Sequence, residues 1–129
     1  MSIAILLITH ENTGSSLLRV LKNTCGQITG KIGNINIKPK NDPKEYTNKI
    51  TATINKLNKT HEGVLILTDL YGSTPYNIVY RIKKTLKSKI EIVTGVNLPM
   101  LIKIITYINL PLKELAHKAM QGGKQGIIK

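Results

Sequence analysis

The stretch S-I-A-I-L-L-I-T-H, residues 2–10, decides the fold class of this 129-residue chain. A short, continuous apolar run such as residues 2–8 is typical of a β-strand that is buried on both faces. Strands of that kind belong to parallel sheets covered by helices on both sides. Three further strands are expected: the alternating segment 31–37 and the apolar runs 63–68 (GVLILT) and 90–94 (IEIVT).

Helical segments lie between and after these strands. Apolar residues recur at helical spacing in 15–25, and Gly26 is placed to end that helix. Asp42 and Pro43 have the character of an N-cap and a first helical residue, opening a helix to about residue 57. Three more helices are expected: 75–86, one from residue 97, and one from Pro111 to a stop at Gly122 and Gly123.

The regular alternation of strands and helices predicts an α/β fold. We expect an open, doubly wound, mostly parallel sheet with helices on both faces. A short final strand at residues 126–128 would complete it. No internal repeat or linker interrupts the pattern, so residues 1–129 are interpreted as a single domain.

The chain is strongly basic, with a formal net charge of +12. Such a charge raises nucleic acid as a partner. However, 17 of the 19 basic residues are Lys, whereas base readout and bidentate phosphate grips favour Arg. The lysines are also scattered along the sequence. We therefore expect a solvated basic surface and no nucleic-acid partner.

Three features indicate a cytoplasmic protein. Cys25 is the only cysteine and cannot form an intrachain disulfide, as is usual in a reducing compartment. The N-terminus lacks the basic leader and cleavage site of a secretory signal. No apolar run approaches the ~20 residues of a membrane span, so no membrane insertion is expected.

The chemistry is expected where the strands end. In open parallel sheets, ligands bind outside the carboxyl ends of the strands. His10 ends the first strand and Asp69 directly follows the third, so the two face each other if those strands are neighbours. A neutral imidazole nitrogen is a nucleophile at pH 7, and a carboxylate on the other nitrogen fixes the tautomer.

The segment after Asp69 has the pattern of a phosphate-binding helix start. Gly72 allows the backbone to approach a ligand closely. Ser73 or Thr74 is placed to cap a helix whose first turn contains Pro75. A helix N-terminus with free N–H groups also binds phosphate, so the helix cap and the phosphate site would use the same backbone N–H groups.

Other polar residues have weaker signals. Tyr71 is expected to be exposed, as a partner contact or as a lid over the crevice, while Asn97 and Pro99 have a capping explanation or contact a partner. His61 and His117 lie in polar stretches and are expected to be solvated. No metal-ligand spacing and no nucleotide-binding glycine pattern is present, so no metal or cofactor is expected.

Three segments together resemble the IIA component of the mannose family of the phosphoenolpyruvate-dependent sugar phosphotransferase system. They are the strand ending in Thr9-His10, the stretch L-I-L-T-D-L-Y-G-S-T-P-Y-N, and the stretch T-G-V-N-L-P-M-L. Their order and separation match the family over nearly the whole chain. The chain departs from it at Glu11, where the family often has Gly, and in its high positive charge.

The resemblance implies a specific activity and architecture. His10 would be phosphorylated at Nε2, receiving the phosphoryl group from the carrier protein HPr and passing it to a IIB protein. Asp69 would orient His10, and the Thr74 hydroxyl would contact the phosphate, with Ser73 beside it. The sheet order would be 2-1-3-4, and the final strand near Ile127 and Ile128 would swap onto a partner subunit in a homodimer.

Two other functions remain open at this point. A regulatory module of the same fold would report phosphorylation state without sugar transport, and it also needs His10. A flavodoxin-like flavin binder is the distant alternative, because T-H-E-N-T-G-S-S resembles a hydroxyl-rich phosphate loop and Tyr71 is able to stack on a ring. A receiver domain needs paired acidic residues after strand one, which Thr9-His10 does not supply.

Overall fold

The structure, a computed structural model, describes residues 2–129. Strands and helices alternate up to β4, and two helices follow it. The elements of the described chain are β1 (Ile3–His10), α1 (Thr13–Cys25), β2 (Ile32–Ile37), α2 (Pro43–Asn58), β3 (Gly63–Thr68), α3 (Thr74–Thr85), β4 (Ile90–Thr94), α4 (Leu98–Thr106) and α5 (Leu112–Gln125).

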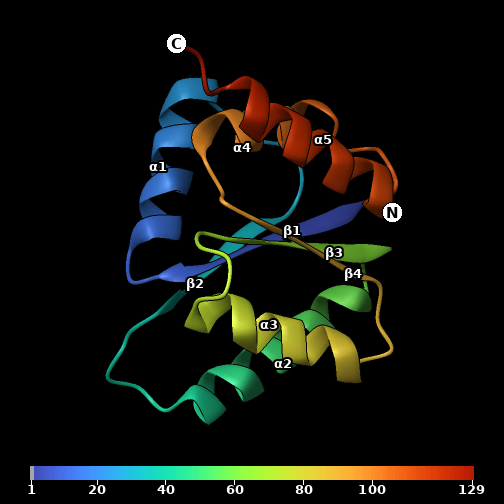
Figure 1. Ribbon diagram of the computed structural model, residues 1–129. Helices are drawn as coiled ribbons and strands as arrows, with labels where there is room; N and C mark the ends of the chain where they lie inside the picture. The colour runs from blue at the N-terminus through green and yellow to red at the C-terminus, as the bar shows by residue number, and fades with distance from the viewer. Residues whose placement is uncertain (1) are drawn as a thin grey trace.

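The four strands form one parallel sheet in the order β2-β1-β3-β4. β1 and β3 are adjacent at its centre, in a register that pairs Leu7 with Leu67. Figure 1 shows helices above and below this sheet. The predicted fold class and the strand order implied by the family resemblance are both confirmed.

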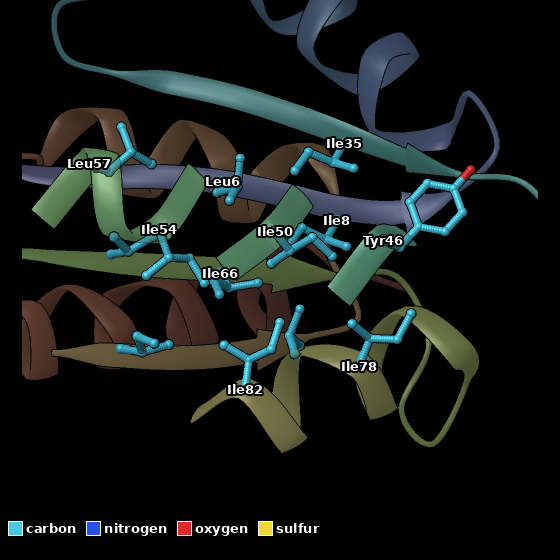
Figure 2. Packing of buried hydrophobic residues seen from close by; sticks show 14 of the residues in the cluster. Leu6, Ile8, Ile35, Tyr46, Ile50, Ile54, Leu57, Ile66, Ile78 and Ile82 are labelled. Atoms are coloured by element: carbon cyan, nitrogen blue, oxygen red, sulfur yellow. The ribbon is translucent and has the colours of Figure 1, made fainter. Parts of the chain in front are cut away.

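Residues of β1 alternate between the two faces of the sheet, as the strand period of two requires. Ala4, Leu6 and Ile8 belong to the core beneath α2 and α3, and none is more than 3% exposed. Figure 2 shows Leu6 and Ile8 among residues of α2 and α3 in this core. Ile3 and Leu7 belong to the other core, beneath α1, α4 and α5. Burying one such side chain stabilises the fold by about 1.5–3 kcal/mol.

Helix α2 begins as predicted. The Asp42 carboxylate accepts the backbone N–H of Lys44 at 3.0 Å, and Pro43 is the first helical residue. Pro has no N–H, so it leaves no unpaired donor at that position. This start fixes where the chain between β2 and α2 crosses the carboxyl edge of the sheet.

The predicted stop at Gly122 and Gly123 is wrong, because α5 continues to Gln125. Both glycines are buried against α4. A Cβ at Gly122 would lie 2.4 Å from the Cβ of Lys103, and one at Gly123 would lie 3.0 Å from the Cε of Met100, both on α4. These glycines therefore allow two helices to approach closely instead of ending one.

The short strand expected at 126–128 is not formed in the single chain that the structure describes. Gly126 caps α5, and residues 127–129 are neither helix nor strand. Ile127 and Ile128 are 80% and 85% exposed. Exchange of this segment with a second subunit stays a prediction.

We expect Gly122→Ala to lower the free energy of unfolding by about 1–3 kcal/mol, because the added methyl group overpacks the contact with Lys103. Helix propensity alone would predict a gain of up to about 1 kcal/mol. Urea unfolding followed by circular dichroism measures the difference. Gln121→Ala, at the exposed neighbouring position, should change stability by less than about 0.5 kcal/mol. A more stable Gly122→Ala variant would refute the packing role.

Candidate functional site

The parallel pairing of β1 with β3 brings His10 and Asp69 together. The Asp69 Oδ2 atom accepts the backbone N–H of His10 at 3.0 Å and lies 2.9 Å from His10 Nδ1. One carboxylate oxygen therefore holds both the main chain and the ring of the histidine. The two residues predicted to face each other across the crevice are in direct contact.

This contact determines which ring nitrogen of His10 is free. An ionised carboxylate only accepts hydrogen bonds, so Nδ1 carries the proton and Nε2 keeps its lone pair. The His10 side chain is 44% exposed, whereas that of Asp69 is only 16% exposed. The imidazole therefore combines a fixed tautomer with a nucleophilic nitrogen that another molecule is able to reach.

His10 lines a cavity of about 320 Å³ together with Thr74, Lys38 and Tyr46. Tyr46 is a buried residue whose hydroxyl accepts the Lys38 backbone N–H at 3.0 Å and the Asn41 side-chain amide at 3.1 Å. Tyr46 of α2 thus holds the β2–α2 loop as one wall of the cavity. Helical spacing identified Tyr46 only as an apolar position, because spacing does not show what a hydroxyl contacts.

The segment after Asp69 reaches the cavity only at Thr74, the first residue of α3. Gly72 has a φ of +79°, a left-handed conformation that favours glycine. Ser73 occupies the N-cap position of α3, but its hydroxyl donates to Leu70 O at 2.6 Å and does not cap the helix. Thr74 is the residue of the three predicted phosphate contacts that lines the cavity with His10.

Tyr71 lies on the surface beside this site. It is 72% exposed, as predicted, and its ring lies against that of Tyr76 in a tilted arrangement, with centroids 4.8 Å and ring planes 52° apart. Tyr76 in turn stacks on Tyr80 at 5.8 Å. The pKa of Tyr76 is raised above its ordinary value of 10.0, mainly by desolvation and to a lesser extent by the neighbouring phenols of Tyr71 and Tyr80. The Tyr76 hydroxyl therefore stays uncharged.

Asn97 and Pro99 belong to a different part of the molecule. The Asn97 carboxamide oxygen accepts the N–H of Met100 at 2.9 Å and its amide donates to Gly123 O at 3.3 Å. Pro99 packs against Gly126. The structure therefore supports their capping and packing explanation, and neither residue lines the His10 cavity.

The loop after His10 is fixed by contacts that the sequence did not reveal. Thr9 is fully buried, and its hydroxyl accepts the N–H of Gly14 at 2.7 Å. A Cβ at Gly14 would lie 2.8 Å from the same oxygen. Between them, Glu11 is exposed and has a φ of +43°, a strained conformation for a residue with a side chain.

Two further observations show where a ligand would bind. Within residues 2–129, no group of three or more His, Cys, Asp or Glu residues is placed to hold a metal ion. The larger cavity of about 630 Å³ is lined by Ile3, Ile90 and Pro111, at the amino ends of the strands. In open parallel sheets ligands bind at the carboxyl ends, so the His10 cavity is the candidate site.

Comparison with known proteins places the chain in a family. Residues 4–120 match the family EIIA-man, described as "PTS system fructose IIA component". The chain belongs to the mannose-type IIA components of the sugar phosphotransferase system. The family resemblance inferred from the three sequence segments is thereby confirmed.

The relatives agree with this assignment. The mannose-specific EIIAB component of Escherichia coli K12 is 31% identical over 129 residues, covering 98% of this chain and 39% of that protein. The sorbose-specific EIIA component of Lacticaseibacillus casei is 31% identical over 122 residues, covering 91% and 83% of the two chains. The chain thus spans about two-fifths of the E. coli relative.

The solved structures support the fold. The mannose/sorbose specific IIA subunit from Enterococcus faecalis superposes with a TM-score of 0.85 at 22% identity, covering 100% of this chain and 95% of that one. In the described part of this IIA component, no helix is long and apolar enough to cross a membrane.

The departure of this IIA component at Glu11 has a structural consequence. Left-handed backbone costs a residue with a side chain about 1–2 kcal/mol, which glycine avoids at an entropic cost of about 0.5–1 kcal/mol. We therefore expect Glu11→Gly to raise the free energy of unfolding by about 0.5–1 kcal/mol. Urea unfolding measures the gain. Glu11→Ala removes the same carboxylate but keeps the strain, so an equal gain in that variant would contradict this explanation.

Proposed function

We propose that this chain carries a phosphoryl group on His10 Nε2, accepting it from HPr and passing it to a IIB protein in the cytoplasm. Residues 1–129 would act as one carrier domain without a cofactor. The observation that supports this most directly is the 2.9 Å contact between His10 Nδ1 and Asp69 Oδ2 beneath a half-exposed ring. Family membership implies a phosphotransferase role for the chain, and we assign that role to His10.

The contact explains how the ring would react. The Nε2 lone pair attacks phosphorus, and the bond from phosphorus to the donor breaks as the N–P bond forms. Nδ1 keeps its proton, so no proton has to leave the ring. The positive charge that develops on the imidazole lies beside the Asp69 carboxylate, which stabilises it. Return of the phosphoryl group to an acceptor follows the same path in reverse.

The start of α3 would bind the phosphoryl oxygens. Thr74 lines the cavity, and the first turn of α3 leaves backbone N–H groups without helical partners. Gly72 and Ser73 precede this turn, and a Cβ built at Gly72 would meet no atom within 4 Å, so the space beside that glycine is open to a ligand. Loop and helix start would therefore act together on the anion.

The acceptor is inferred from the family. The E. coli relative is named as a combined EIIAB component, and this chain corresponds to 39% of it. A partner that takes the phosphoryl group would therefore be a IIB domain or protein. Which sugar is transported depends on components other than the residues of this site.

We expect the purified chain to gain an acid-labile, base-stable phosphate on incubation with phosphoenolpyruvate, enzyme I and HPr. His10→Ala should gain none, because it lacks the acceptor nitrogen. Asp69→Asn should be labelled roughly 10- to 10⁴-fold more slowly, since an amide neither orients nor stabilises the ring as a carboxylate does. Radiolabel transfer in a quench-flow apparatus measures these rates.

His117→Ala is the matched control, because His117 is exposed on α5 and outside the cavity. It should be labelled at the wild-type rate. Equal labelling of His10→Ala and wild type would overturn the proposed function.

We also propose that the chain forms a homodimer by exchange of its C-terminal segment. β4 is an edge strand of the sheet. Ile127 lines a cavity of about 190 Å³ with Val93 and Thr94 of that strand, while Ile128 is exposed. Exposed apolar residues beside an open strand edge favour pairing with another chain. A second subunit would cover both the open edge of β4 and the exposed apolar side chains.

The double variant Ile127→Asp/Ile128→Asp should be monomeric at concentrations where the wild type is dimeric, because buried carboxylates disfavour the exchanged strand. Light scattering coupled to size exclusion measures the mass. Val20→Asp changes an apolar residue that is 43% exposed on α1 and should leave the dimer intact. A dimer that persists in the double variant would disprove strand exchange through these residues.

A further inference from the structure

A second cavity lies at the amino ends of the strands, at the edge of the sheet opposite His10. Its volume is about 630 Å³, compared with about 320 Å³ for the His10 cavity, and the two share no lining residue. Small-molecule sites in proteins commonly enclose about 300–1,000 Å³. We call this space, lined among others by Ile3, Ile90, Leu112, Lys83, Lys89 and Lys113, the amino-edge cavity. The proposed carrier reaction makes no use of it.

Segments that are far apart in the sequence form the amino-edge cavity. Lys89 comes from the loop between α3 and β4, and Leu112 is the first residue of α5. Figure 1 shows this loop and the start of α5 at the right of the view. A Cβ built at Gly63, the first residue of β3, would lie 3.0 Å from Leu112 Cδ2 and 3.3 Å from Lys89 Cβ. The glycine therefore lets the loop and the start of α5 pack against the same point of the sheet.

Part of the lining is aliphatic. Ile3 of β1 and Ile90 of β4 are buried in the cores on the two faces of the sheet, and Leu112 is half-buried against the same core as Ile3. Pro111 adds further apolar surface beside them. The apolar body of a ligand is removed from water on such a surface, which favours its binding.

The charged part of the lining has an excess of positive charge. Three lysines and two glutamates line the cavity, which gives a net charge of +1. The Lys83 ammonium donates to Glu91 Oε2 at 2.8 Å, and Glu62 has a partner of its own. Lys89 and Lys113 take part in no ion pair in the described chain, residues 2–129. A bound molecule would therefore meet two unpaired ammonium groups beside an aliphatic surface.

We propose that the amino-edge cavity binds a small organic phosphate monoester with an apolar body. The apolar body packs on Ile3 and Ile90, and the phosphate lies between Lys89 and Lys113. A phosphate monoester carries about −1.5 to −2 charges at pH 7, which balances two ammonium groups. Ion pairs with exposed lysines are individually weak, so both parts of the ligand contribute to its affinity. This site goes beyond the proposed carrier function and leaves the carboxyl edge of the sheet to the transfer reaction.

The test is a titration of the full ¹⁵N-labelled chain with 1-naphthyl phosphate, followed by amide NMR signals at low salt. The signals of Ile90 and Leu112 should shift with a Kd of about 0.5 mM, which is ordinary for a ligand of this size. Lys89→Glu/Lys113→Glu should raise the Kd about fivefold or more, because it reverses both charges. The same spectra report whether the variant is folded. 1-Naphthol keeps the rings but lacks the phosphate, and it should bind the wild type about fivefold or more weakly.

Helix α2 supplies a matched control. Lys49 and Lys56 are exposed on this helix and lie outside the amino-edge cavity. Lys49→Glu/Lys56→Glu makes the same change in net charge and should leave the Kd for 1-naphthyl phosphate within about twofold of wild type. His10→Ala should also bind within about twofold, because His10 lies at the other edge of the sheet. 1-Naphthylacetate, with a single negative charge, should bind more weakly than the phosphate.

Several outcomes would overturn the site. Equal loss of affinity in the two double variants would mean general charge attraction. Loss of binding in His10→Ala, with normal binding in Lys89→Glu/Lys113→Glu, would place the phosphate in the His10 cavity. A Lys89→Glu/Lys113→Glu variant that is monomeric where the wild type is dimeric would make the cavity part of a subunit interface. No shift of the wild-type signals up to about 5 mM 1-naphthyl phosphate would exclude the site outright. None of these results depends on whether His10 is labelled by HPr.

Discussion

The site depends on the parallel register between β1 and β3. That register places the end of β1 beside the residue that follows β3, so Asp69 Oδ2 holds both the backbone N–H and the ring of His10. A slip of one residue would turn the histidine to the opposite face of the sheet. The slip is prevented because alternate residues of β1 are buried in the two cores on opposite faces of the sheet. A shift of one residue would move each of these side chains into the wrong core. Core packing therefore determines the chemistry.

The His10–Asp69 contact serves orientation more than stability. The ring is nearly half exposed, and water screens an ion pair in such a position, so its contribution to folding is small. Its value lies in fixing the proton on Nδ1 and the direction of Nε2. The buried Oδ1 atom of Asp69 has no hydrogen-bond partner within residues 2–129, so the carboxylate is bound through one oxygen. The negative charge of this carboxylate stabilises the positive charge that the His10 ring gains during the reaction.

Local signals in the sequence predicted most of the fold. The apolar run of β3 and the Asp42-Pro43 start of α2 need only their own residues to be identified. Gly122 shows where this fails, because a glycine that ends a helix and one that admits a neighbouring helix have the same sequence signal. Only the contact with Lys103 distinguishes them. The Tyr46 hydroxyl was missed for a similar reason, since its partners lie on a loop of unpredictable path.

Thr9 and His10 show how one dipeptide organises the whole edge. Adjacent strand residues point to opposite faces, so Thr9 faces the layer of α1 and His10 faces the layer of α2 and α3. The Thr9 hydroxyl holds the start of α1 through Gly14, while the histidine enters the cavity with Tyr46. The connection between β1 and α1 must therefore turn sharply, which accounts for the left-handed backbone at Glu11. The strain at residue 11 follows because Thr9 and His10 must make contacts on opposite faces of the sheet immediately before the chain turns into α1.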